Sequence, residues 1–399
     1  MKKSIHLSAP ALVCCAGLNA NELYESCLLG RQDGFVMRDY DGKKYPVGQI
    51  NAELPDVDFK YWKDSYPEDS WVFSGKTRII KIIEAALLQL EDAVEKAKAK
   101  YGPEKVGVCF GTCDNGSEAS FAAHENFLEK KSFPKNYNLC FQNASFPAEF
   151  VSRRFGLGGP VFTIATACAS GASAIIRGAE LIRAGYCSAV IAGGADVVSQ
   201  TVFTGFNVLE AVSDSLCNPF SKNRKGINLG EAAAFFLLAA DEISGIELLG
   251  AGESSDAYHM TAPGEDGAGP AKAMKAALLD AGIESRDIGY VNLHGTGTAL
   301  NDRAEAVAMK NVFNTAPPAS STKPVTGHTL GAAGALEAAI CWTALNERKG
   351  LPVHCWDGAA DEEISFLPAG REHKPPSICM SNSFAFGGCN VSLILGEKS

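Results

Sequence analysis

The sequence contains no apolar run as long as the roughly 18 residues that a membrane-spanning helix requires. Basic residues are also in the minority, since 36 Lys and Arg stand against 46 Asp and Glu, which gives a formal net charge of −10. An acidic chain with dispersed basic residues is poorly suited to bind nucleic acid. We therefore expect neither a membrane span nor a nucleic-acid partner.

The 13 cysteines include no CxxC pair and no Cys/His cluster with zinc-ligand spacing. Their odd number fits poorly with a disulfide framework. Free thiols in a reducing compartment are the simpler interpretation, so we expect a cytoplasmic location and no metal. The first 17 residues imitate a signal peptide, but Pro10 interrupts their apolar part. We expect a first strand over residues 4–14 instead, followed by a helix that Asn21 caps.

Strand and helix patterns alternate along most of the 399 residues, which predicts an α/β protein with parallel strands. Residues 31–74 are rich in Asp, Tyr, Pro and Lys and are expected to be irregular surface excursions. We expect two halves, residues 1–243 and 244–399, because both alternate strands with helices. The alternation is consistent with an internal structural duplication, although no residue-level repeat marks it. The expected helices and strands beyond residue 75 are 76–100, 117–130, 269–281, 302–313 and 329–347 (helices) and 106–110, 161–166, 189–192, 231–240, 246–252, 290–293 and 320–322 (strands), with two more strands within 377–395.

The stretch at residues 161–185 carries the first candidate catalytic residue, Cys168. A run of β-forming residues ends there and a helix of small residues begins at once. The positive end of a helix dipole favours a thiolate and lowers the thiol pKa. Taken alone, a buried structural cysteine is the better interpretation of this position.

Two further motifs contain histidine beside strand ends. The sequence HGTGT places His294 after a buried strand, with Thr296 and Thr298 able to hydrogen-bond a polar ligand. In STKPVTGHTLGAAGALE, His328 lies where a helix begins, a position that favours a neutral imidazole. Lys323 is expected to orient this histidine or to hold a carboxylate such as Glu337. Each motif alone also fits a packed histidine or a solvated lysine.

The last motif, NSFAFGGCNVSLIL, places Phe384 and Phe386 beside a diglycine. An aromatic residue next to such a flexible turn can gate a pocket, and its backbone N–H can help to stabilise an oxyanion. A hairpin with core aromatics is the alternative for this motif alone. One cysteine, two histidines and a lysine, each beside a strand end or a small-residue turn, together favour a nucleophilic active site.

These motifs closely resemble those of the β-ketoacyl-[acyl-carrier-protein] synthases, in their elongating class with two active-site histidines. The resemblance covers nearly the whole chain. It implies an α/β protein with the thiolase fold, layered αβαβα with two similar halves and working as a dimer. The matching blocks are ATACASGASAI, GGAD, NLGEAA, SSDAYHMTAP, DAGI, IGYVNLHGTGT, NDRAEA, STKPVTGHTLGAAGALEA and NSFAFGGCNVSL.

The resemblance implies a decarboxylative Claisen condensation. Cys168 would accept an acyl group from an acyl carrier protein as a thioester. His294 and His328 would stabilise the enolate that forms when malonyl-acyl carrier protein loses carbon dioxide, and this enolate would attack the thioester to give a 3-oxoacyl product. Covalent catalysis and charge stabilisation suffice, so the chain needs no metal or redox cofactor, and phosphopantetheine arrives on the carrier.

Supporting roles follow from the same resemblance. Lys323 and Glu337 would organise the histidines, and the backbone N–H of Phe386 would join that of the nucleophile in an oxyanion hole. Thr296 and Thr298 would hold the phosphopantetheine arm. The chain would act in fatty acid or type II polyketide or aryl polyene-like synthesis, as a homodimer or as a heterodimer with a related ketosynthase-like subunit.

Several readings compete with this one. Initiating synthases carry Asn at the position of His328. A thiolase would carry a second catalytic cysteine near its end, where Cys389 replaces the Thr usual in this turn. A non-catalytic subunit that shapes chain length in a heterodimer would lack the nucleophile. The presence of Cys168 argues against this alternative. A thioesterase-like hydrolase would release free acid.

Some residues depart from the family's pattern and bear on the substrate. Asp114 in the loop GTCDNG stands where relatives line the acyl pocket with apolar residues, so it either meets a polar or hydroxyaryl acyl tail or faces solvent. Ala385 replaces the Gly usual between the two phenylalanines. Glu210 stands where an arginine that contacts the carrier is common, so the candidates for the acidic carrier surface become Lys222, Arg224 and Lys225. These departures favour a specialised pathway over housekeeping elongation.

Overall fold

The computed structural model describes residues 3–57, 77–114, 117–135, 137–361 and 367–397. Its main sheet has 12 strands. These strands are β1 (His6–Leu7), β2 (Ala11–Cys14), β5 (Val106–Gly111), β6 (Val161–Ile164), β7 (Ala189–Asp196), β8 (Ala232–Ala239), β9 (Ile246–Ser255), β10 (Tyr290–Asn292), β11 (Pro318–Ser320), β12 (Leu367–Pro368), β13 (Ile378–Phe384) and β14 (Cys389–Glu397). The helices are α1 (Ala20–Leu29), α2 (Arg78–Tyr101), α3 (Ser117–Lys130), α4 (Ser145–Phe155), α5 (Ser170–Arg183), α6 (Gln200–Val208), α7 (Ala268–Ala281), α8 (Ala299–Val312), α9 (Lys323–Thr326) and α10 (Ala333–Glu347).

The pairing of the strands reveals the internal duplication. In the first half β2, β8 and β7 pair antiparallel, and β7, β5 and β6 then pair parallel. In the second half β9, β14 and β13 pair antiparallel, and β13, β10 and β11 pair parallel. The two five-strand units therefore share one order and one set of directions, with β1 bridging β8 and β9. The duplication is plain in the topology although no residue-level repeat shows it.

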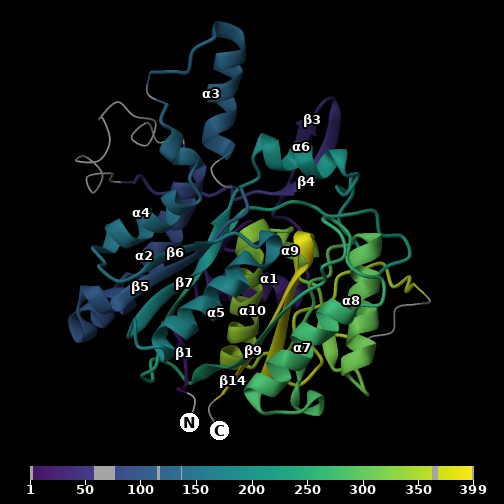
Figure 1. Cartoon of the computed structure of the whole chain (residues 1–399). Helices are drawn as coiled ribbons and strands as arrows, with labels where there is room; N and C mark the ends of the chain where they lie inside the picture. The colour runs from purple at the N-terminus through teal and green to yellow at the C-terminus, as the bar shows by residue number, and fades with distance from the viewer. Residues whose placement is uncertain (1–2, 58–76, 115–116, 136, 362–366, 398–399) are drawn as a thin grey trace.

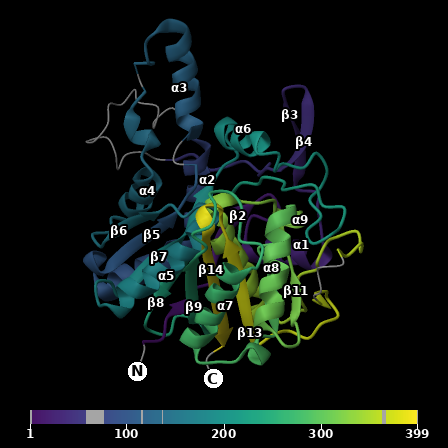
Figure 2. The same ribbon diagram turned by 45° about the vertical axis from the view of Figure 1, so that its right-hand side comes forward.

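Helices cover both faces of this sheet in layers. The central pair, α5 and α10, pack on each other, and α10 contacts β8 of the first half as well as β13 and β14 of the second. Helices α2 and α4 lie on the outer face of the first half, and α7 and α8 on that of the second (Figure 1 and Figure 2). Helices enclosed between two layers of strands need apolar side chains, and small ones where they approach each other closely. Accordingly, nearly every residue of α10 is buried, and α5 begins with small side chains.

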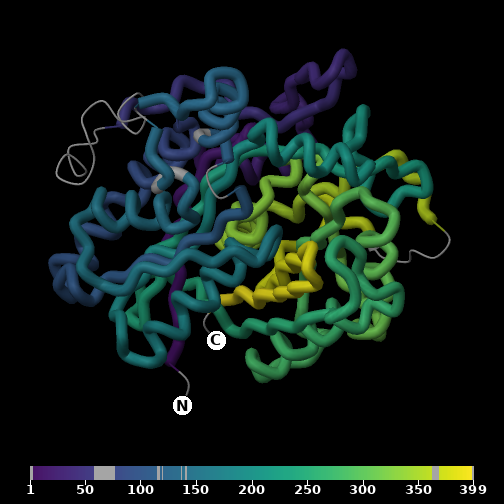
Figure 3. The backbone as a smooth tube through the Cα atoms, turned by 45° about the horizontal axis from the view of Figure 1, so that its top comes forward, coloured from purple at the N-terminus to yellow at the C-terminus, as the bar shows by residue number. Residues whose placement is uncertain are grey.

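Two excursions project beyond the layers. Helix α3 rises from the first half, and the ribbon of β3 (Phe35–Tyr40) and β4 (Lys43–Gly48) projects beside α6, as Figure 3 also shows. The expectation of irregular structure over residues 31–74 is therefore wrong for β3 and β4, where a turn at Asp41-Gly42 closes a hairpin. Tyr40 stacks on Phe203 of α6, so a tertiary contact stabilises this hairpin. Residues 58–76 lie outside the described part of the chain.

Other local expectations also change. The strand expected over residues 4–14 is broken into β1 and β2 around Pro10, which cannot donate a ladder hydrogen bond. The cap of α1 is Asn19 rather than Asn21, because the Asn19 side chain accepts the backbone N–H of Glu22 at 3.0 Å. Lys323 does not follow a strand directly, since it begins the short helix α9. Within the described residues no helix is long and apolar enough to cross a membrane.

Candidate active site

Cys168 lies in a tight 3-10 turn, Ala167–Ala169, between β6 and α5. Ala167 has a φ of 49°, which bends the chain sharply before the nucleophile. Helix α5 follows at once, and Gly171 allows the close approach that this turn requires: a Cβ there would lie 2.7 Å from the carbonyl oxygen of Gly331. The turn thus presses the start of α5 against the segment that follows His328.

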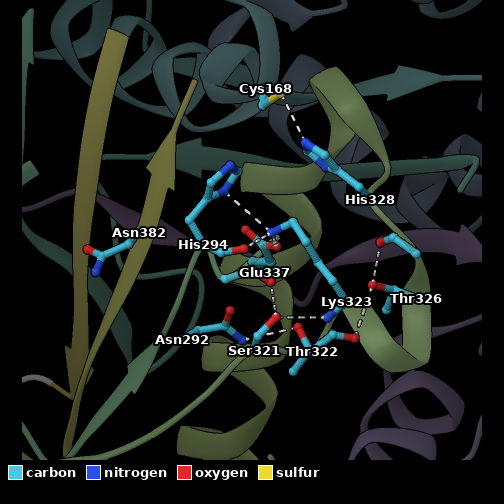
Figure 4. A network of polar contacts seen from close by, with 12 residues as sticks. Cys168, Asn292, His294, Ser321, Thr322, Lys323, Thr326, His328, Glu337 and Asn382 are labelled. Atoms are coloured by element: carbon cyan, nitrogen blue, oxygen red, sulfur yellow. Dashed lines mark hydrogen bonds and ion pairs between the residues drawn. The ribbon is translucent and has the colours of Figure 1, made fainter. Parts of the chain in front are cut away.

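The Cys168 thiol faces His328, with Sγ and Nε2 3.0 Å apart (Figure 4). Burial raises the pKa of Cys168 to about 12, and the nearby Lys323 cation only partly opposes this shift. The expectation that a helix N-terminus lowers this pKa is therefore wrong, because desolvation of the thiolate outweighs it. Burial also holds the pKa of His328 well below its usual range, so the pair is a neutral thiol beside a neutral imidazole.

His294 stands across from His328, with ring centroids 5.4 Å apart and ring planes nearly perpendicular. Burial first, then Lys323 and His328, depress the pKa of His294 far below normal. The Lys323 ammonium lies 3.4 Å from His294 Nδ1 and 2.5 Å from its carbonyl oxygen. An ammonium only donates, so Nδ1 is the unprotonated nitrogen and the ring proton resides on Nε2.

Lys323 is neutralised by Glu337, whose Oε1 lies 2.5 Å from Nζ in a fully buried ion pair. Burial raises the pKa of Glu337, and Lys323 opposes that rise. Of the two roles expected for Lys323, it therefore holds the carboxylate of Glu337, and the imidazole that it contacts is His294 rather than His328 (Figure 4). A buried cation and its counterion fix the orientation of one imidazole without exposing charge to the cavity.

A buried carboxylate that the sequence reasoning missed anchors the HGTGT loop. Glu305, on α8, accepts the backbone N–H of His294 at 2.9 Å and that of Gly295 at 2.8 Å. Asn382 donates to the same carboxylate at 3.3 Å. Burial raises the pKa of Glu305 to about 7, and the two backbone N–H groups only partly counter that rise. The signal available in the sequence is the acidic residue in NDRAEA, which by itself reads as part of a solvated helix face.

The three reactive side chains line a cavity together with four other predicted site residues. Phe384 ends β13 and lies edge-on to His294, while Phe386 lies in the next turn, Phe386–Gly388, and stacks on Phe206 of α6 at 5.7 Å. The hydroxyls of Thr296 and Thr298 lie 2.9 Å apart on the cavity wall. The predicted residues that share this cavity are Cys168, His294, Thr296, Thr298, His328, Phe384 and Phe386.

Asp114 does not join this group. Its side chain is buried, being 6% exposed, and it is absent from the lining of the cavity beside Cys168. Its carboxylate receives hydrogen bonds from Ser117 and, at 2.9 Å, from Ser199. Burial raises the pKa of Asp114, and these two hydroxyls oppose the rise. Asp114 therefore has its hydrogen-bond partners within the protein. The alternative expectation, that Asp114 faces solvent, is wrong.

The basic residues proposed for carrier contact differ in availability. Arg224 is mostly buried and pairs with Asp361 at 2.9 Å, so its guanidinium is already engaged with a segment distant in sequence. Lys225 is 66% exposed and lies with Glu210 on a groove that continues from the cavity past Phe386. Cys389 begins β14 and is not among the residues that line the cavity.

Cys168, His294 and His328 form the group, within the described ranges, whose ligand atoms could share a metal ion, since these atoms all lie within 4.8 Å of one another. A thiol and two imidazoles are zinc-type donors. Binding a metal would occupy the nucleophile and both imidazoles at once. A metal ion bound by these three side chains would therefore inhibit the site rather than take part in catalysis.

Two family models match the chain. The N-terminal domain of β-ketoacyl synthase matches residues 14–242, and the C-terminal domain of β-ketoacyl synthase matches residues 246–354. Among curated proteins, 3-oxoacyl-[acyl-carrier-protein] synthase 2 of Staphylococcus aureus is 31% identical over 340 residues, covering 79% of this chain and 82% of that protein. The protein of the same name from Vibrio cholerae is 35% identical over 335 residues, covering 78% and 80%.

Solved structures agree with these matches. A ketosynthase in complex with its chain length factor from Xenorhabdus doucetiae superimposes with a TM-score of 0.91 at 38% identity, covering 99% of this chain and 98% of that one. A β-ketoacyl synthase from Burkholderia phymatum gives a TM-score of 0.85 at 28% identity, with both chains fully covered. The expected thiolase fold with two similar halves is thereby confirmed. With both of its halves matched, the chain belongs to the β-ketoacyl synthase family.

Proposed function

We propose that this chain is an acyltransferase of the 3-oxoacyl-[acyl-carrier-protein] synthase type. The observation that carries the proposal is the pairing of Cys168 Sγ with His328 Nε2 at 3.0 Å, with His294 facing the same cavity. A nucleophile beside a neutral imidazole is the arrangement that thioester exchange requires. The second imidazole is redundant for simple hydrolysis but suits the stabilisation of an enolate oxygen.

The first step transfers an acyl group to the enzyme. His328 Nε2 takes the thiol proton, the sulfur of Cys168 bonds to the acyl carbon, and the bond from that carbon to the pantetheine sulfur breaks. The proton then passes to the departing pantetheine thiolate. Burial raises the pKa of the thiol, which favours loss of the proton to His328 as the sulfur attacks.

The second step forms the carbon–carbon bond. The malonyl thioester loses carbon dioxide, and the electron pair of the broken carbon–carbon bond becomes an enolate whose oxygen lies beside His294. His294 donates from Nε2, because Lys323 occupies Nδ1. The enolate carbon bonds to the acyl carbon, the bond from that carbon to the Cys168 sulfur breaks, and the Cys168 thiolate takes up a proton from solvent. The product is a 3-oxoacyl thioester. No cofactor takes part besides the phosphopantetheine that the carrier brings.

Acyl carrier protein is the proposed partner at the cavity mouth. The groove beside Phe386 combines apolar rim residues, Leu209 and Leu300, each about half exposed, with the exposed ammonium of Lys225. An acidic carrier helix with an apolar edge complements this mixture. Of the three basic candidates, Lys225 carries this proposal, because it lines the groove and its acidic neighbour Asp214 lies 4.0 Å away. Arg224 lines the groove too, but Asp361 already pairs with it at 2.9 Å.

We further propose that the chain acts in a dimer, as the catalytic subunit, in the cytoplasm. Among the described strands β6 ends the main sheet and pairs only with β5, which leaves an open edge on which Phe162 is 51% exposed. Among the structural relatives, ketosynthases occur with chain length factors, so a related subunit is an alternative to a second copy. The twelve cysteines that the structure describes are all free, which suits a reducing compartment.

Intact-protein mass spectrometry tests the reaction. The chain is mixed with acyl-loaded and malonyl-loaded carrier proteins, and the masses of the enzyme and of the carrier-bound product are followed. We expect an acyl adduct that Cys168→Ala abolishes, together with a 3-oxoacyl carrier. Condensation that persists in Cys168→Ala would overturn the mechanism, and release of free acid alone would favour a hydrolase. Paired runs with hydroxyaryl and plain fatty acyl carriers test whether the pathway is specialised.

A further inference from the structure

The carboxylate of Asp196 lies beneath the active site, and the proposed chemistry does not use it. Asp196 is the last residue of β7 and is fully buried. Its hydrogen-bond partners are neutral N–H and O–H groups rather than a cation. A buried carboxylate without a cationic partner is costly unless hydrogen bonds compensate for its lost hydration. The hydrogen bonds of Asp196 must therefore offset the cost of its burial.

Four hydrogen bonds use both oxygens of Asp196. Oδ1 accepts the hydroxyl of Thr112 at 2.7 Å and the backbone N–H of Asp114 at 3.1 Å. Oδ2 accepts the backbone N–H of Cys113 at 2.8 Å and that of Gly331 at 2.6 Å. Thr112, Cys113 and Asp114 belong to the loop after β5, whereas Gly331 belongs to the turn that leads from His328 into α10. One side chain thus joins two segments that are far apart in sequence.

Glycines bring the backbones of these segments into direct contact. A Cβ on Gly111 would lie 2.5 Å from the nitrogen of Gly171, and one on Gly194 would lie 2.8 Å from the oxygen of Gly331. A Cβ on Gly331 would lie 2.5 Å from Oδ2 of Asp196. Four segments therefore meet backbone to backbone near the centre of the molecule in Figure 1. They are the end of β5, the start of α5, strand β7 and the turn after His328.

A further contact ties the nucleophile's turn to the same junction. The hydroxyl of Ser170 accepts the backbone N–H of Thr166 at 2.9 Å and lies 2.6 Å from the carbonyl oxygen of Ala167, closing the turn around Cys168. The same hydroxyl lies 3.4 Å from the carbonyl oxygen of Thr112. The loop that Asp196 holds is thus the loop on which the Cys168 turn rests.

We propose that Asp196 is a positioning residue that sets the separation of Cys168 and His328 for acyl transfer. Its carboxylate accepts three hydrogen bonds from the loop that supports the Cys168 turn and one from the turn after His328. Without this tie the Sγ–Nε2 contact loosens, although neither reacting side chain touches Asp196. The inference rests on the proposed acyl transfer at Cys168.

The test is Asp196→Asn. This change keeps the shape of the side chain but replaces one acceptor oxygen by an NH₂ donor, which faces N–H and O–H groups that need an acceptor. Loading of Cys168 from an acyl-carrier protein that acylates the wild type is followed by mass spectrometry at several carrier concentrations. Because a misplacement of about 1 Å can slow a reaction about 100-fold, we expect kcat for loading to fall about 10- to 100-fold per folded molecule. KM for the carrier should stay within about twofold, since the carrier surface is unchanged.

The matched control is Glu231→Gln. Glu231 is also a fully buried carboxylate that accepts a backbone N–H, that of Ile50 at 2.8 Å, but it pairs with Arg78 away from the cavity. Both variants should lower Tm, while only Asp196→Asn should lower the loading kcat. Asp196→Glu keeps a carboxylate and should retain more activity than Asp196→Asn.

Three results would overturn the proposal: a loading kcat of Asp196→Asn close to that of the wild type, an equal loss in Glu231→Gln, or a change confined to KM. If Asp196→Asn does not fold, Thr112→Val decides, because it removes one of the four bonds; a loading kcat equal to the wild-type value then counts against the proposal. A wild type that no acyl carrier loads would contradict the proposed function instead, which keeps the two failures distinct.

Discussion

At the scale of single residues, buried charge governs the site. The pair of Lys323 and Glu337 shows this most clearly, because both side chains are almost fully buried and Nζ lies 2.5 Å from Oε1. Removing one partner of such a pair leaves the other charge without compensation. We expect Glu337→Gln to lower the free energy of unfolding by about 3–5 kcal/mol, as measured by denaturant titration.

The control for this prediction is the surface pair of Lys98 and Glu95, whose atoms lie 2.7 Å apart with the Glu95 side chain about half exposed. Glu95→Gln should cost less than about 1 kcal/mol, since water screens and replaces the interaction. Equal costs for the two variants would show that the buried pair is not held as the structure places it.

Glu305 gives a prediction about pH. Burial raises its pKa from the reference value of 4.5 to about 7, so between these values the folded chain binds a proton that the unfolded chain has released. The resulting stabilisation is full below pH 4.5 and is lost as the pH rises through about 7. A pKa difference of this size corresponds to about 3 kcal/mol in the free energy of unfolding.

Glu305→Gln removes this titration and leaves the other acids in place. We therefore expect the wild type's advantage in unfolding free energy over Glu305→Gln to be larger at pH 4.5 than at pH 8, by about 3 kcal/mol. Denaturant titrations of both proteins at the two pH values give the difference. An advantage that stays constant or grows with pH would contradict the raised pKa.

At the scale of elements, the cap of α1 separates what local sequence can and cannot specify. Asn19 and Asn21 are both suitable caps, and the hydrogen bond from Glu22 N selects Asn19. Asn19→Ala should lower stability by about 1 kcal/mol. Asn21→Ala, two residues away on the same helix, should change it little, and thermal unfolding of the two variants compares them directly. A larger loss in Asn21→Ala would reverse the assignment of the cap.

The elements that sequence reasoning found are those with strong periodicity or small-residue signatures. The run that forms α2 and the turn around Cys168 carry their own patterns, and the predicted helices and strands beyond them are largely present. The β3–β4 hairpin was missed because its stability depends on Tyr40 stacking against Phe203, which is distant in sequence. Helices α4 and α6 were likewise not expected, although the structure has both.

The same division holds within the site. Sequence reasoning named Cys168, His294 and His328, because small-residue turns mark each of them, and the structure brings all three to one cavity. It missed Glu305 and Asp196, since a buried acid and a solvated acid look alike in sequence. It also gave Cys168 the wrong pKa direction, because burial depends on the packing of both halves and not on the helix that follows.

At the scale of the whole molecule, the duplicated topology explains why the site lies where it does. Helices α5 and α10 follow equivalent strands, β6 and β11, in the two halves, and they pack on each other in the central layer. The nucleophile precedes α5, and His328 precedes α10. Packing two equivalent helix starts together therefore places Cys168 beside His328, so the central contact between the halves creates the reactive pair.

The open edge of β6 leads to the last prediction, about assembly. The edge lies four residues before Cys168, and Phe162 on it is 51% exposed. Because a bare strand edge with an exposed aromatic favours strand pairing with another chain, Phe162→Lys should shift the purified chain from dimer toward monomer in sedimentation velocity. Leu279→Lys is the control, since Leu279 is 83% exposed on α7, away from this edge. The control should sediment as the wild type does.

A Phe162→Lys variant that remains fully dimeric, or a control that dissociates equally, would place the dimer contact elsewhere. A wild type that is monomeric alone and dimerises only with a related ketosynthase-like subunit would identify the heterodimer, and Phe162→Lys should then weaken that pairing instead.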